Sequence, residues 1–156
     1  MAGSVLPSGG QIFTTMPDIL FIPEFVFGGL VWTLVASTRV TEANPLGWVM
    51  FVSIFCFVFT TLWFLIFIIG KNKSSAWPVL DVIYHAIAVL FYLSASVLLA
   101  LVTLNLKTTL DFLDVTVLPY YFKTYQEYIS AVVFAFVTTL LYFIHAILSA
   151  LRWKSS

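Results

Sequence analysis

Apolar residues are grouped along the chain into four long runs that are separated by short polar segments. Each run can cross a membrane as an α-helix, because the hydrocarbon core needs about 20 mainly apolar residues at about 1.5 Å each. Transmembrane β-strands would instead show about 10 residues of alternating polarity, and no run alternates in this way. The pattern predicts an all-α integral membrane protein, a bundle of four transmembrane helices. The predicted spans are residues 19–38, 48–69, 82–104 and 129–151.

The connections between the runs differ in length. Residues 39–47 and 70–80 are short, so consecutive spans among the first three are expected to be antiparallel neighbours. Residues 105–128 form a longer connection, in which VLPYYFK (117–123) resembles a segment lying in the membrane interface, where aromatic rings are favoured. This layout divides the chain into a flexible N-terminal tail (1–17), a four-helix domain (18–151) and a short basic tail (152–156).

Composition supports the membrane assignment and excludes several other classes. Hydrophobic residues make up 62% of the chain and charged residues only 9%, whereas soluble domains carry about 25% charged residues. Seven basic and seven acidic residues cancel, so no basic surface is available for nucleic acid. No Ser/His/Asp arrangement, phosphate-binding glycine loop or metal-ligand cluster stands out in the sequence. We therefore expect no enzyme activity, no catalytic residues, no cofactor and no metal.

An even number of spans places both termini on the same side of the membrane. Basic residues are slightly more numerous on that side, which favours a cytoplasmic location for both termini. On the side of the termini lie Lys71, Lys73, Arg152 and Lys154, and on the other side lie Arg39, Lys107 and Lys123.

Three ionisable residues interrupt the apolar runs. Counted from the span ends, Glu24, His85 and His145 fall in one layer of the cytoplasmic leaflet, with Thr60 and Thr61 of the second span beside them. Ionisable side chains inside a membrane are costly and usually pair with one another in the bundle interior. We predict a polar layer of Glu24, His85 and His145 that fixes helix packing or binds a lipid headgroup. The alternative is that each side chain reaches the interface separately.

Asp81 and His85 are four residues apart and share one helix face. Two ligands do not make a metal site. Asp81 near the start of its helix is explained more simply by a favourable interaction with the helix dipole.

The first span contains an unusual stretch, FIPEFVFGGLVW (21–32). A helix that began at Pro23 would be too short to cross the bilayer, so Pro23 is expected to bend a continuous helix that starts near Asp18 and to turn Glu24 inward.

Small residues four apart let helices approach closely in lipid, although chance spacing is the alternative. The predicted packing positions are Gly28, Gly29, Thr33, Ser96 and Ala100.

Two further segments are candidates for lipid contact. Leu118, Tyr120 and Lys123 match a proposed cholesterol-binding pattern, which is weak and can equally describe an aromatic interfacial anchor. The C-terminal basic residues can attract anionic lipid or carry sorting information, or they can simply end the last helix. The residues of this segment are Arg152, Trp153, Lys154, Ser155 and Ser156.

Several stretches resemble the MAL-like proteolipids of the MARVEL-domain family. They are LPSG (6–9), FGGLVW (27–32), LVAS (34–37), GWVMFVS (47–53), YHAIAVLFYLSASVL (84–98), AVVF (131–134) and LRWKSS (151–156). The resemblance implies a four-helix fold with cytoplasmic termini. Three features depart from the pattern: Pro23, Leu99 in place of a glutamate, and the longer connection at 105–128.

The resemblance also implies a function. MAL-like proteins associate with cholesterol- and sphingolipid-rich membrane and act in apical vesicle traffic or myelin organisation, at the plasma membrane and in transport vesicles and endosomes. We therefore expect a membrane organiser whose partners are lipids and further copies of itself. One alternative is a small ion or proton channel or transporter that uses the Glu/His layer. Another is an adaptor for cytoplasmic proteins, for which the short tails offer little surface.

Overall fold

The computed structural model describes residues 18–37, 43–70, 76–112 and 118–155. These residues form one 3-10 turn and four helices, η2 (Asp18–Leu20), α1 (Phe21–Ser37), α2 (Ala43–Ile69), α3 (Trp77–Leu110) and α4 (Leu118–Ser155). All four helices are long and apolar enough to cross a membrane, as the sequence predicts for this part of the chain. The predicted all-α fold with four spans is confirmed.

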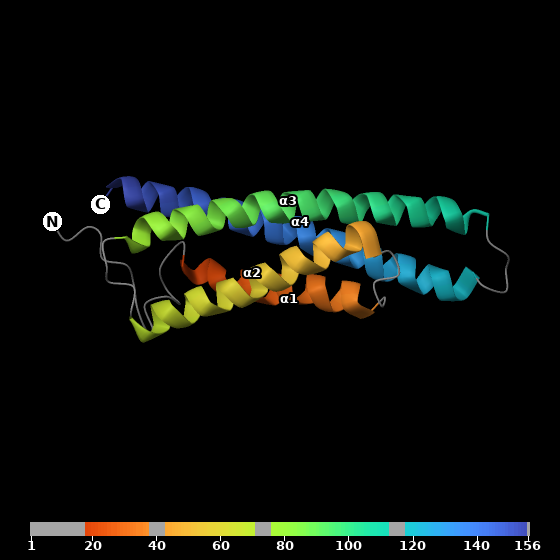
Figure 1. The fold of residues 1–156 in the computed structure, drawn as a ribbon, viewed down its shortest axis with the longest axis horizontal. Helices are drawn as coiled ribbons and strands as arrows, with labels where there is room; N and C mark the ends of the chain where they lie inside the picture. Colours follow the sequence, from red (N-terminus) through yellow and green to blue (C-terminus); the bar gives the residue numbers. More distant parts are fainter. Residues whose placement is uncertain (1–17, 38–42, 71–75, 113–117, 156) are drawn as a thin grey trace.

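The helices form a closed ring around a common core. The two longest, α3 and α4, lie side by side over most of their length, while α1 packs against α2 and α4, and α2 packs against α3 (Figure 1). Opposite helices therefore meet only through side chains that reach the centre of the bundle. The start of the first span and the end of the fourth lie at the same end, since Arg152 hydrogen-bonds to Asp18. Which side of the membrane this end faces stays a prediction.

The sequence predicts a long connection over residues 105–128, but most of these residues are helical. Within it, α3 continues to Leu110 and α4 already starts at Leu118. Thr108 and Thr109 hydrogen-bond to backbone carbonyls one turn earlier, which allows these polar residues to continue α3. The described residues of VLPYYFK form the first turns of α4 rather than a separate interfacial segment, and Val117 lies outside the described residues.

The first span starts at Asp18, as expected. Asp18–Leu20 is a 3-10 turn and the α-helix begins at Phe21, so Pro23 lies in the first turn of α1. A missing backbone N–H in that turn costs no α-helical hydrogen bond. Glu24 is buried, as expected for a side chain that turns inward. A bend at Pro23 stays a prediction.

The surface and the core divide the apolar residues between lipid and protein. Large apolar side chains are exposed along every helix, including Phe51 on α2 and Leu90 on α3, and only lipid can cover so continuous an apolar surface. Inside, a cluster made mainly of valine, leucine, alanine and tyrosine side chains fills the bundle. Leu99 is fully buried in this cluster, at the position where the resemblance implies a glutamate.

Candidate functional site

An ion-pair network closes the end of the bundle where α1 starts and α4 ends. Arg152 donates to both carboxylate oxygens of Asp18, from Nη1 at 2.6 Å and from Nη2 at 3.3 Å, and Nη2 also donates to Asp81 Oδ2 at 3.0 Å. Both aspartates are fully buried, and the Arg152 side chain is 19% exposed. A planar guanidinium suits this bidentate arrangement. Arg152 thus joins the starts of α1 and α3 to the end of α4.

Asp81 is the centre of this network. Besides Arg152, it accepts hydrogen bonds from Ser149 Oγ at 2.7 Å and from Trp63 Nε1 at 3.1 Å, so that α2 is also attached. The simpler role expected for Asp81, a charge that complements the helix dipole at the bundle edge, is therefore incomplete. Its carboxylate is buried and contacts side chains of α2 and α4.

The structure brings Glu24, His85 and His145 together one layer further inside. His145 Nδ1 lies 2.9 Å from Glu24 Oε2, and His85 Nε2 lies 3.8 Å from Glu24 Oε1. The two imidazole rings stack with centroids 3.6 Å apart. All three side chains are completely buried. These residues form one contiguous group across α1, α3 and α4 and do not reach the interface separately.

A third layer of hydroxyl groups follows. Thr60 of α2 hydrogen-bonds to the hydroxyls of Tyr84 and Tyr142, and Tyr84 also donates to the carbonyl of Cys56. Thr61 does not join them, because its hydroxyl bonds to the carbonyl of Phe57 in its own helix. Thr60 thus joins α2 to the hydroxyl layer, as Trp63 joins it to Asp81.

The predicted packing positions have different environments. Gly28 is buried against Tyr92 and Thr138, whereas Gly29 faces the ring of Phe57 on α2. Ser96 is buried and bonds to Thr139 of α4. Ala100 is half-buried beside α4. Thr33 is exposed, and its hydroxyl bonds back to Gly29 and Leu30, so it makes no helix–helix contact through this hydroxyl.

Substituting Gly28 tests this close contact. A Cβ at position 28 would lie 3.1 Å from the Tyr92 hydroxyl oxygen, and Tyr92 is fully buried. We expect Gly28→Leu to lower the free energy of unfolding by about 1–3 kcal/mol through overpacking, as measured by thermal unfolding in lipid nanodiscs. Gly47→Ala is the control, because nothing lies within 4 Å of a Cβ there. Equal stability of the two variants would contradict the packing role.

The proposed lipid and tail residues lie at opposite ends of α4. Leu118 and Lys123 are in its first two turns, where Lys123 is 79% exposed and lies 3.9 Å from Glu127, while the Tyr120 side chain is outside the described residues. At the other end, Trp153 and Lys154 are exposed and Ser155 ends the helix. Ser156 is outside the described residues. Arg152 is not part of a free tail, because it is committed to the ion-pair network.

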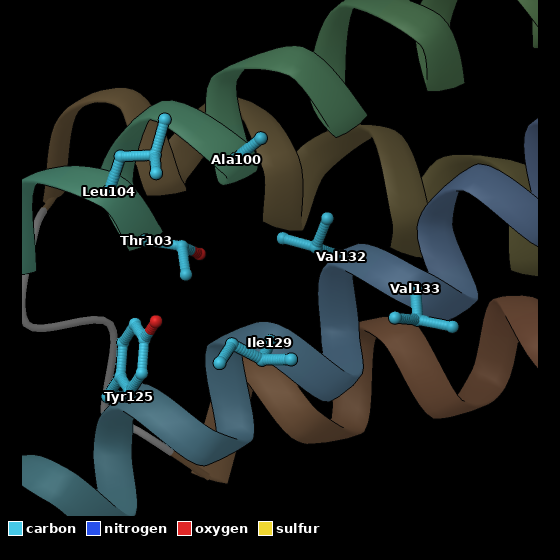
Figure 2. A pocket seen from close by; sticks show the side chains of 7 residues that line it. All are labelled: Ala100, Thr103, Leu104, Tyr125, Ile129, Val132 and Val133. Atoms are coloured by element: carbon cyan, nitrogen blue, oxygen red, sulfur yellow. The ribbon is translucent and has the colours of Figure 1, made fainter. Parts of the chain in front are cut away.

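Two apolar grooves follow the seam between α3 and α4 on the outside of the bundle. One, of about 290 Å³, is floored by Ala100 and Val132, and the Tyr125 hydroxyl turns toward Thr103 at one side of it (Figure 2). The other, of about 380 Å³, lies over Ala86, Ala146 and Ala150. Small residues at the seam leave these spaces open toward lipid.

Sequence reasoning missed the outer network and the tyrosines. Asp18, Asp81 and Arg152 look like ordinary charges at helix ends, and the only signal was that all three belong to the same end of the bundle. Tyr84 and Tyr142 stand one residue before His85 and three residues before His145, a spacing that places them next to the predicted polar layer.

Four apolar helices whose buried charged side chains are gathered inside one end define a multi-pass membrane protein with a polar core. Residues 12–148 match the MARVEL family, described as a membrane-associating domain. The chain belongs to the MARVEL family.

Individual relatives cover almost the whole chain. It is 54% identical to Myelin and lymphocyte protein of Canis lupus familiaris and 52% identical to that of Homo sapiens, in each case over 99% of this chain and 95% of the relative. It is 28% identical to CKLF-like MARVEL transmembrane domain-containing protein 8 of Homo sapiens, over 93% of this chain and 78% of the relative. No solved structure shows significant similarity to the chain.

Proposed function

We propose that this MARVEL protein is a non-enzymatic organiser of ordered, sterol- and sphingolipid-rich membrane that supports polarised vesicle transport or myelin-type membrane. The plasma membrane, especially its apical or raft-enriched parts, and transport vesicles are its proposed locations. The similarity to proteins named for myelin and lymphocytes supports this assignment. The observation that carries it is the length of the lipid-facing apolar surface.

On three of the four helices this apolar surface is longer than an ordinary bilayer requires, whereas the first span, Asp18–Ser37, has 20 residues. The apolar segment Leu46–Ile69 of α2 has 24 residues, which corresponds to about 36 Å at about 1.5 Å per residue. The stretches between Asp81 and Lys107 on α3 and between Glu127 and Arg152 on α4 have similar lengths. Hydrocarbon cores measure about 27 Å in the endoplasmic reticulum and about 32–33 Å in sterol-rich plasma membrane. Hydrophobic matching therefore favours the thicker, ordered membrane.

The seam between α3 and α4 offers a surface for the lipid itself. The groove in Figure 2 is apolar except for the hydroxyls of Thr103 and Tyr125 at one end. A sterol has the same distribution, a rigid apolar ring system with one hydroxyl. We propose that sterol contacts this groove with its hydroxyl near Thr103 and Tyr125. Lipid contact by Leu118, Tyr120 and Lys123 stays a separate proposal.

Partition between lipid phases tests the proposal. Purified, fluorescently labelled chain in phase-separated giant vesicles is expected to prefer the ordered phase. The variant Leu101→Lys/Leu104→Lys shortens the apolar surface of α3, because both side chains are exposed to lipid. Its ordered-to-disordered partition ratio should fall about threefold, since mismatch costs fractions of a kcal/mol per Å. The control is Phe112→Lys, because Phe112 is 86% exposed beyond the apolar stretch. A wild-type preference for the disordered phase would overturn the proposal.

The second candidate is a proton or ion channel, and the buried Glu24–His85–His145 group is the observation that favours it. Beyond the hydroxyl layer, however, the core is filled mainly by apolar residues such as Val31, Val35 and Leu99. Flux measurements with the purified chain in sealed liposomes distinguish the two candidates. Flux that is lost in Glu24→Gln would favour the channel, and ordered-phase partition without flux would favour the organiser.

A further inference from the structure

We propose that Glu24, His85 and His145 form a buried binding site for a divalent transition-metal ion, with Zn²⁺ as the best fit. The site lies where α1, α3 and α4 meet, and the ion would join these three helices from inside the bundle. Sequence spacing does not predict it, because the three ligands are on three different helices.

The types of ligand atom and the distances between them suit zinc. One ligand atom from each residue lies within 4.8 Å of the others, and all three residues are buried. Zinc accepts two histidine nitrogens and one glutamate oxygen and leaves a fourth position open. Bonds of about 2.0–2.1 Å place tetrahedral ligands about 3.4 Å apart. The separation of His85 Nε2 and Glu24 Oε1, 3.8 Å, needs a small inward movement, and the two stacked imidazole rings must also tilt so that their in-plane lone pairs point at one ion.

Three atoms of this group make no hydrogen bond in the described part of the molecule. They are Glu24 Oε1, His85 Nε2 and His145 Nε2, which lie on side chains that are completely buried, and the nearest approach between the first two is 3.8 Å. Buried polar atoms nearly always have a hydrogen-bond partner. Three buried atoms without a hydrogen bond in one group therefore point to a ligand site at this place.

The contacts of the two histidines determine which ring nitrogen is left for a ligand. Nδ1 of His85 lies 2.8 Å from the backbone carbonyl of Asp81 and 3.3 Å from its carboxylate Oδ1. Both oxygens can only accept, so Nδ1 carries a proton, and in the neutral ring Nε2 has a lone pair. His145 donates from Nδ1 to the Glu24 carboxylate in the same way. Imidazoles whose second nitrogen donates to a carbonyl or carboxylate are typical of metal ligands, and a lone pair on Nε2 can bind a cation.

The charges at this end of the bundle support a divalent ion. Among the described residues, Asp18, Glu24 and Asp81 are completely buried here, and Arg152 is their one cationic partner. With neutral histidines this leaves two negative charges in excess, which one divalent cation balances. Protons on both histidines would give the same balance, but the two cationic rings would then stack at 3.6 Å and repel each other. The metal ion avoids that repulsion.

A neighbouring group of potential ligands is a poorer site. Asp18, Asp81 and His145 also offer ligand atoms within 4.8 Å of one another. Arg152, however, already binds both carboxylates, and its positive charge would repel an ion there. The inner group of Glu24, His85 and His145 has no such cation between its ligands.

Metal content and cobalt spectroscopy test the site. The full chain is produced with an affinity tag that lacks histidine, placed in lipid nanodiscs, and analysed for metals by mass spectrometry. It is then stripped with a chelator and titrated with Zn²⁺ or Co²⁺. We expect about one ion per chain and visible Co²⁺ absorption bands of tetrahedral nitrogen and oxygen ligation. Zn²⁺ should also raise the melting temperature of the stripped protein by about 5 °C.

Matched variants identify the ligands. Glu24→Gln and His85→Gln are expected to weaken Co²⁺ binding at least about a hundredfold, because each removes a ligand. Glu127→Gln should bind as wild type, since Glu127 lies at the other end of the bundle and bonds to Ser37. Circular dichroism of each variant checks folding. Wild-type protein that binds neither ion after growth in zinc-supplemented medium and after titration would overturn the proposal. Binding that is unchanged in folded Glu24→Gln and His85→Gln would overturn it equally.

Discussion

Replacing Arg152 with alanine is expected to lower the free energy of unfolding by about 3–5 kcal/mol, the cost of leaving one side of a buried ion pair without its partner. Asp18 and Asp81 are both completely buried, and Arg152 donates to each of them. Without the guanidinium, two neighbouring carboxylates would repel each other where water can scarcely reach. Thermal or denaturant unfolding in nanodiscs measures the loss.

Two further variants separate this role from that of a basic tail. Lys154→Ala removes an exposed cation two residues further along the helix and should change stability by less than about 0.5 kcal/mol. Arg152→Lys keeps the charge but loses the bidentate geometry, so its stability should be intermediate. If Arg152→Ala is as mild as Lys154→Ala, the ion-pair network does not stabilise the bundle.

The second large effect is expected in the inner layer, between Glu24 and His145. Glu24→Gln removes the charge from the observed 2.9 Å contact and His145→Ala removes the contact itself, and each should cost about 2–4 kcal/mol. The double variant should cost less than the sum by about 1–3 kcal/mol, because the same contact cannot be lost twice. The four proteins are unfolded in the presence of a chelator, so that the coupling reports the direct contact and not a shared ion.

An exposed pair supplies the comparison for this cycle. Lys123 and Glu127 lie 3.9 Å apart, with Lys123 79% exposed, and surface pairs of this kind on one helix contribute about 0.3–0.5 kcal/mol. Coupling between Glu24 and His145 should clearly exceed coupling between Lys123 and Glu127. Strict additivity of Glu24→Gln and His145→Ala would show that the two residues are close without interacting.

The four helices could be predicted because lipid imposes a minimum apolar length, and each run exceeds it. The helix ends could not be predicted equally well. Beyond the hydrocarbon the chain no longer needs apolar residues, so α3 continues through Lys107, Thr108 and Thr109, and α4 begins at Leu118. In these segments, local hydrogen bonds of threonine and the position of Pro119 in the first turn decide the boundaries, and apolar length says nothing about them.

Only part of the polar core could be predicted from the sequence, and the reason differs from that for the helix ends. Depth follows from counting residues, which is why Glu24, His85 and His145 could be assigned to one layer. Helix rotation does not follow from the apolar pattern, because the lipid-facing and the core-facing sides are both apolar. Thr33 and Gly28 illustrate this, since both were equal candidates for packing, but Thr33 faces outward and Gly28 inward.

The outer ion-pair network has a consequence for biosynthesis. Asp18 and Arg152 are separated by 134 positions, and Arg152 ends the last of the four spans to leave the ribosome. Asp18 and Asp81 are therefore already in or near the membrane before the cation that pairs with both has been made. Until the fourth helix is inserted, the first three form an incomplete bundle with two uncompensated carboxylates. Pairing of both carboxylates with Arg152 therefore has to wait for completion of the final span.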